Sequence, residues 1–174
     1  LLKFNIKLIG GDTTSSSKIY LSSTFISKRI KKNKTINRKN AQVGDSIYTF
    51  NNIGFSKLGY LSLFENKLLK KNLLQKSKNQ FLKPKIIYYS NLFNKCKINS
   101  CIDISDSLFF SLKELSLQSK KKFFINNLIG ISPVLFKNLE LNEYYRLILS
   151  SGEEFIPVFN GKLTRQNIQN FKLN

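Results

Sequence analysis

The sequence YYRLILSSGEEFIPVF, residues 144–159, indicates how the chain folds near its C-terminal end. Two runs rich in aromatic and aliphatic residues, 144–149 and 155–159, flank the polar segment SSGEE. Two such runs around a short glycine-containing segment are typical of a β-hairpin. We therefore expect an antiparallel hairpin here.

Upstream of this segment, the apolar spacing changes to that of helices. Leu108, Leu112 and Leu115 recur at helical spacing within residues 107–119, and Ser105 or Asp106 is placed to cap that helix. A second helix is expected over residues 66–83, because Pro84 follows it. Residues 46–50 and 53–64 have the composition of extended segments. The predicted fold class is α+β, a small mixed core with the C-terminal hairpin and basic extended arms.

Positive charge is the dominant property of the chain. Its 174 residues contain 29 Lys and Arg against 10 Asp and Glu, a formal net charge of +19. Residues 1–97 hold 20 of these bases and three acids, whereas residues 98–174 hold nine bases and seven acids. We therefore expect two parts, a strongly basic RNA-binding extension over 1–97 and a small α+β domain over 98–174.

The basic residues gather in three places: residues 28–39, one face of the helix expected over 66–83, and residues 120–122. Nearly all are Lys, which suits phosphate contact better than the bidentate reading of bases. They predict binding to an RNA backbone, driven by counterion release. The candidate RNA-binding residues are Lys28, Arg29, Lys31, Lys32, Lys34, Arg38, Lys39, Lys67, Lys70, Lys71, Lys76, Lys78, Lys120, Lys121 and Lys122.

Several kinds of site are disfavoured by the sequence. There is no His, and the two cysteines, Cys96 and Cys101, cannot complete a tetrahedral zinc site. Gly54 and Gly59 have the spacing of a phosphate loop, but Tyr60 stands where such a loop needs Lys. We therefore expect no enzyme, no catalytic residue, no metal and no cofactor. A run of about 18 apolar residues is also lacking, so no membrane span is expected.

The last third of the chain resembles small-subunit ribosomal protein nineteen. The resemblance rests on the basic run at 120–122, the segment SPVL at 132–135, the sequence GEEFIPVF at 152–159 and the apolar positions of 163–171. It implies a structural protein of a mitochondrial-type ribosome, located in the organellar matrix. The partners it implies are rRNA and neighbouring ribosomal proteins, with no small-molecule substrate.

Three alternatives remain open from the residues. A peripheral accessory subunit of an organellar membrane complex would use the same charge on anionic lipid. A non-catalytic nucleic-acid-binding protein outside the ribosome would use it on any nucleic acid. A nuclease would need clustered carboxylates for metal ions, for which Asp103, Asp106 and Glu114 are the candidates.

Overall fold

The computed structural model describes residues 6–27, 35–50, 52–65, 70–85, 89 and 96–163, without the side chain of Ile129. It contains two compact units, Leu1–Lys32 and Asn33–Asn174. In the first unit, residues 6–27 form no helix or strand and their side chains are exposed. Residues 28–34, most of the expected basic arm, lie outside the described residues.

The second unit is built on a three-stranded antiparallel sheet. Its strands are β1 (Ser46–Thr49), β2 (Lys97–Asp103) and β3 (Pro157–Lys162), in the order β1-β3-β2. The strand expected at 46–50 and the α+β class are thereby confirmed, whereas β2 was not foreseen. Because β1 pairs with β3, Tyr48 opposite Phe159, the sheet joins residues on both sides of the expected division at 97/98. The contacts instead divide the chain after Lys32.

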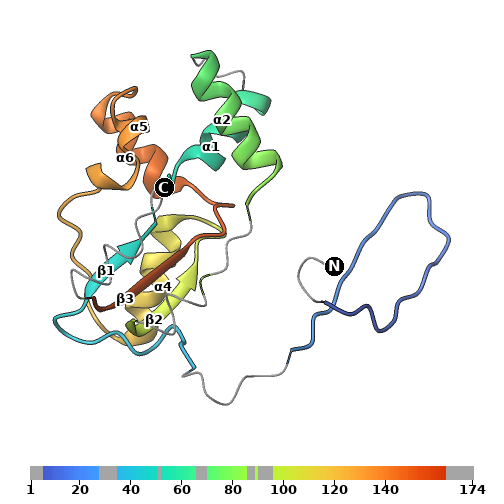
Figure 1. Ribbon diagram of the computed structural model, residues 1–174, viewed down its shortest axis with the longest axis horizontal. Helices are drawn as coiled ribbons and strands as arrows, with labels where there is room; N and C mark the ends of the chain where they lie inside the picture. The colour runs from blue at the N-terminus through green and yellow to red at the C-terminus, as the bar shows by residue number, and fades with distance from the viewer. Residues whose placement is uncertain are drawn as a thin grey trace. The chain divides into compact units, whose positions relative to one another are not determined.

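Helix α4 (Leu108–Ser119) lies along one face of this sheet (Figure 1). Its side chains Leu108, Leu112 and Leu115 are buried at helical spacing, which confirms the helix expected over 107–119. The cap, however, is Ser107, whose Oγ accepts a hydrogen bond from the Phe110 amide at 3.1 Å.

The other helices gather at one end of the sheet (Figure 1). They are α1 (Phe55–Phe64), α2 (Lys71–Leu82), the short α5 (Pro133–Phe136) and α6 (Leu141–Ser150), and the 3-10 turn η2 (Ile129–Ile131) leads into α5. Helices α1 and α2 approach closely, since a Cβ on Gly59 would collide with the backbone of Ser77. Helix α2 confirms the described part of the helix expected over 66–83.

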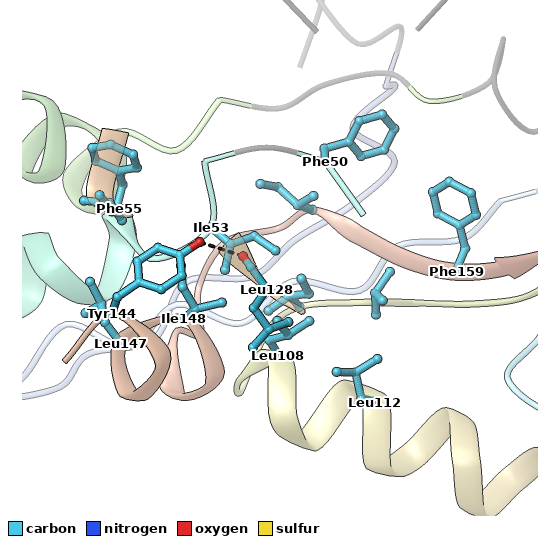
Figure 2. Packing of buried hydrophobic residues seen from close by; sticks show 14 of the residues in the cluster. Phe50, Ile53, Phe55, Leu108, Leu112, Leu128, Tyr144, Leu147, Ile148 and Phe159 are labelled. Atoms are coloured by element: carbon cyan, nitrogen blue, oxygen red, sulfur yellow. Dashed lines mark hydrogen bonds between the residues drawn. The ribbon is translucent and has the colours of Figure 1, made fainter. Parts of the chain in front are cut away.

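The core between the helices and the sheet is organised around Tyr144, which is fully buried. Figure 2 shows its ring among Ile53, Phe55 and Ile148, with its hydroxyl directed at the Leu128 carbonyl. That hydroxyl donates to the Leu128 oxygen at 2.7 Å. Because the Tyr144 hydroxyl is hydrogen-bonded inside an apolar cluster, it fixes the position of α6 relative to the segment that contains Leu128.

Two predicted extended segments are helical in the structure. Residues 144–149 belong to α6, and residues 55–64 form α1. The expected C-terminal hairpin is therefore wrong: β3 is real, but its partners are β1 and β2. Tyr144, Leu147 and Ile148 are the buried residues of α6, at the spacing of one helix face. None of the helices in the described ranges has the length and hydropathy that crossing a membrane requires.

Candidate functional site

The loop between β2 and α4 carries two carboxylates that the helix cap does not use. Asp103 ends β2, and Asp106 lies exposed just before the capping residue Ser107. The sequence predicted Ser105 or Asp106 as the cap. Because Ser107 takes that role, Asp106 remains available to a ligand.

The turn that follows α6 lies directly on this loop. The Glu153 amide donates to the Ser105 oxygen at 2.6 Å, and the Glu154 amide donates to the Ile104 oxygen at 3.1 Å. A Cβ on Gly152 would collide with the carbonyl oxygens of Asp106 and Ser105, so only glycine allows this approach. Glu153 itself has φ 53°, in the left-handed region. The contact brings Glu153 beside Asp106, although 47 positions separate them.

Asp106 and Glu153 share a shallow hollow of about 170 Å³ with Lys57 of α1. We call it the acidic hollow; its other lining residues are Ser56, Tyr60, Phe81, Ser150 and Gly152. The Lys57 ammonium lies 5.0 Å from the centre of the Tyr60 ring. Two acidic residues and one lysine therefore line a single opening between α1, the β2–α4 loop and the turn after α6.

The side chains of Lys57, Asp106 and Glu153 are of the types that bind a phosphate together with a divalent cation. Mg²⁺ is commonly held by one or two carboxylates together with substrate phosphates and waters. Asp106 and Glu153 meet that requirement, and Lys57 supplies a point charge for a phosphate oxygen. In the described part of the chain, no three acidic, Cys or His side chains gather as a metal cage. The nuclease alternative, which needed Asp103, Asp106 and Glu114 clustered, therefore has no support there.

Glu154, next to Glu153, is turned into the interior and is 1% exposed. Burial raises the pKa of its carboxyl, against hydrogen bonds from Ser151 and from the Gly54 and Ser56 amides that lower it. Adjacent glutamates thus occupy opposite environments, one at the hollow and one inside the protein.

A larger hollow of about 960 Å³ lies between β1, α4 and residues 121–131. Its lining is mainly apolar, and its carboxylate, Asp45, is already bonded to Asn99 at 2.9 Å and to the Gln42 amide at 2.8 Å. Lys121 and Lys122 also line this larger hollow, whereas the smaller, acidic hollow is lined by two acidic residues and one lysine.

Those of the predicted RNA-binding residues that the structure describes lie elsewhere. Lys28, Arg29, Lys31, Lys32, Lys34 and Lys67 are outside the described residues. Lys70, Lys71 and Lys76 come together beside Asn138, where α2 begins. The remaining ones are dispersed: Lys78 on α2, Arg38 and Lys39 before β1, and Lys120, Lys121 and Lys122 after α4. None of the described ones lines the acidic hollow.

Sequence reasoning missed Lys57, Asp106 and Glu153 as a set. Asp106 was interpreted as a helix cap and Glu153 as part of a hairpin tip. A usable signal was the segment SGEE itself, because a glycine beside two acids after an apolar run permits close backbone approach.

The fold is a small α+β domain in which Lys57, Asp106 and Glu153 line one hollow, and comparisons with known proteins show what the chain is similar to. No family model matches the chain. It is similar to the thiamine-monophosphate kinase of Buchnera aphidicola subsp. Schizaphis graminum, with 36% identity over 100% of this chain and 53% of the relative. The enzymes of that name from Leptospira interrogans and Nitrosopumilus maritimus are 32% and 29% identical, over 91% and 98% of this chain. The chain spans about half the length of these curated relatives.

Solved structures share the fold. The thiamine-monophosphate kinase from Stenotrophomonas maltophilia K279a superposes with a TM-score of 0.61 at 15% identity, over 78% of this chain and 45% of that chain. AaThiL complexed with AMPPCP and TMP gives a TM-score of 0.55 at 22% identity, over 72% of this chain and 41% of that chain.

These findings overturn the ribosomal interpretation. The relatives carry the name of a kinase, and none of those named here is a ribosomal protein, so the predictions of a structural rRNA-binding role, of no enzyme and of no small-molecule substrate are wrong. The relatives belong to bacteria and an archaeon, which contradicts a mitochondrial location. Two physical reasons explain the error. The hairpin that carried the resemblance is a helix followed by a strand, and the absence of His excludes only chemistry that depends on His. The membrane-subunit and nucleic-acid-binding alternatives gain no support either.

Proposed function

We propose that this chain takes part in the phosphorylation of thiamine monophosphate, the activity for which its relatives are named. The observation that carries the proposal is similarity along the whole chain, at 36% identity to the Buchnera enzyme. The acidic hollow adds a place where the phosphate groups of that reaction would be bound.

The chemistry fits a chain without His. A kinase of this kind moves the terminal phosphoryl group of a nucleotide onto a phosphate oxygen of thiamine monophosphate, breaking one P–O bond and forming another. That acceptor oxygen is already ionised, so a strong general base is not required. Phosphoryl transfer depends mainly on positioning and on neutralising the charge of the phosphates. A solved structure that shares the fold, AaThiL, is complexed with AMPPCP and TMP.

Each charged residue of the hollow has a role in this proposal. Asp106 and Glu153 would hold a divalent cation, which when bound neutralises negative charge on the phosphates. The Lys57 ammonium would contact a phosphate oxygen from the α1 side. Tyr60 lies under Lys57 and limits the directions that its ammonium can take.

The lysine-rich surface acts at longer range in the same proposal. Residues 1–97 carry most of the excess charge, and the described bases among the predicted set lie outside the hollow. A positive field of this kind raises the local concentration of anionic substrates. Direct contact between these lysines and RNA stays a prediction from the sequence.

Steady-state kinetics with thiamine monophosphate, ATP and Mg²⁺ test the site in the full chain. We expect Asp106→Asn and Glu153→Gln each to lower kcat by about 100-fold, the scale for losing one electrostatic contact to a reacting group. Both variants should also need more Mg²⁺ for half-maximal rate. Lys57→Gln should lower kcat/KM by about 10-fold while leaving the Mg²⁺ requirement unchanged.

Glu140→Gln is the matched control, because it removes an exposed carboxylate at the opposite end of α6. Its kinetics should equal those of the unaltered chain. If Asp106→Asn and Glu153→Gln behave like Glu140→Gln, the acidic hollow is not the phosphate site.

A further inference from the structure

Glu154 contacts two of the segments that surround the acidic hollow, α1 and the β2–α4 loop, but it does not line the hollow itself. Its Oε1 accepts hydrogen bonds from the Gly54 amide at 2.7 Å, the Ser56 amide at 3.4 Å and the Ser151 hydroxyl at 2.5 Å. Its Oε2 is buried and has no hydrogen-bond partner in the described structure. A carboxyl in this position is costly to bury, so its contacts need an explanation beyond packing.

The first two contacts cap helix α1 from a distance of about 100 positions in the sequence. The amides at the start of a helix have no partner within the helix and require an acceptor. The N-cap of α1 is Gly54, which has no side chain to supply one, and it makes no side-chain cap bond. Glu154 therefore replaces a local cap, together with the Ser151 hydroxyl, which accepts a hydrogen bond from the Lys57 amide at 3.4 Å and donates one to Glu154.

The backbone on either side of Glu154 is bonded to the opposite wall of the hollow. The Glu153 amide donates to the Ser105 oxygen at 2.6 Å, and the Phe155 amide donates to the Ile104 oxygen at 3.2 Å. One short segment thus holds the β2–α4 loop through its backbone and α1 through the Glu154 side chain. Lys57 lies in the first turn of α1, and Asp106 lies in that loop.

We propose that Glu154 is a positioning residue that sets the spacing between Lys57 on α1 and the carboxylates of Asp106 and Glu153. The importance of that spacing for turnover rests on the proposed kinase function. The spacing itself is a property of the fold, and it can be tested separately from turnover by measuring the affinity of the chain for a divalent cation.

Glu154→Asp and Glu154→Gln distinguish positioning from packing. The aspartate shortens the side chain by one bond, roughly 1.5 Å, so the carboxyl cannot reach α1 without moving the turn. A displacement of that size at a catalytic site costs about 100-fold. We expect kcat of Glu154→Asp to fall by at least about 10-fold, with KM for ATP changed less. The glutamine keeps the length and the Oε1 acceptor, so its kcat should stay within about 3-fold of the unaltered chain.

Ser132→Ala is the structural control. The Ser132 hydroxyl is buried and donates to the Ile53 oxygen at 2.5 Å, next to the start of α1. Its loss removes one buried hydrogen bond from the same neighbourhood without altering the turn. We expect Ser132→Ala to lower the melting temperature and to leave kcat unchanged. A kcat loss in Glu154→Asp no larger than that of Ser132→Ala would overturn the positioning proposal.

Mn²⁺ affinity separates this proposal from the proposed function. We expect the full chain to bind Mn²⁺ at the acidic hollow, with an affinity about 10-fold weaker in Glu154→Asp and unchanged in Glu154→Gln and Ser132→Ala. That pattern without turnover would support the positioning role and contradict the kinase function. Equal affinities in all four proteins, or no Mn²⁺ binding by the unaltered chain, would overturn the positioning role.

Discussion

At the scale of single residues, neighbouring glutamates with the same chemistry lie in different environments. Glu153 is exposed at the acidic hollow, whereas Glu154 is buried against the start of α1. The sequence could not separate them, because the partners of Glu154, Gly54 and Ser56, lie about 100 positions away. Only the tertiary contact decides which of two adjacent acids meets a ligand. The same limit applies to Asp106, which the sequence offered as a helix cap or as a metal ligand with Asp103 and Glu114, but not as a neighbour of Glu153.

The buried carboxyl of Glu154 predicts a pH dependence of stability. Its pKa is raised in the folded protein, because burial disfavours the charged form. The contribution of the Glu154 carboxyl to the free energy of unfolding is therefore complete below its pKa in the unfolded chain, about 4.3. This contribution is lost as the pH rises through the pKa of Glu154 in the folded protein. Relative to Glu154→Gln, the unaltered chain should lose free energy of unfolding as the pH rises, by at most about 1.4 kcal/mol per pH unit.

Urea unfolding of both proteins between about pH 4 and pH 8 measures this difference. Glu140→Gln, which removes an exposed carboxyl, controls for general charge effects. A free-energy difference between the unaltered chain and Glu154→Gln that is constant or increases with pH would contradict the assignment.

At the scale of elements, the sequence predicted those with one clear periodicity. Helix α4, the described part of the helix at 66–83 and strand β1 were expected from spacing and from Pro84. Helices α1 and α6 were interpreted as extended, because their aromatic and β-branched residues favour strands in short windows. Their buried residues nevertheless follow helical spacing, as Phe55, Leu58 and Gly59 do in α1. Packing against α2 and the core outweighs the local preference there.

The α1–α2 contact gives a prediction for Gly59. A Cβ at this position would overlap the Ser77 carbonyl oxygen and press on the Phe81 Cβ. Because a backbone oxygen cannot move aside cheaply, Gly59→Ala should lower the free energy of unfolding by about 3 kcal/mol, despite the better helix propensity of alanine. Chemical denaturation measures the change.

Gly130→Ala is the control for that variant, since nothing lies within 4 Å of a Cβ built on Gly130. Its effect should stay within about 0.5 kcal/mol. Equal stabilities of the two variants would show that α1 and α2 do not pack through Gly59.

At the scale of the whole molecule, the net charge of +19 selects anions but does not identify them. The sequence predicted RNA from that charge, and the relatives indicate nucleotide and phosphate substrates. Net charge determines long-range attraction and solubility, and it carries no information on fold or catalysis. The proposed function comes instead from similarity along the whole chain, to which the acidic hollow adds a candidate site.

The long-range field predicts a salt dependence of kinetics. Added salt shortens the screening length from about 14 Å near 0.05 M to about 4 Å near 0.5 M. Over that range, kcat/KM for the anionic substrates should fall by about 10-fold, while kcat at saturation changes little. Initial rates in KCl at fixed Mg²⁺ measure this, and an unchanged kcat/KM would show that the surface lysines do not attract the substrates.

The proposal that this chain takes part in the phosphorylation of thiamine monophosphate is tested most directly by ³¹P NMR of the reaction. The full chain is incubated with thiamine monophosphate, ATP and Mg²⁺, and the same mixture with Asp106→Asn serves as the reference. We expect the diphosphate resonances of thiamine diphosphate and ADP to grow together with the unaltered chain and to be strongly reduced with the variant. A spectrum in which thiamine monophosphate persists unchanged, from a folded chain that binds neither substrate, would contradict it.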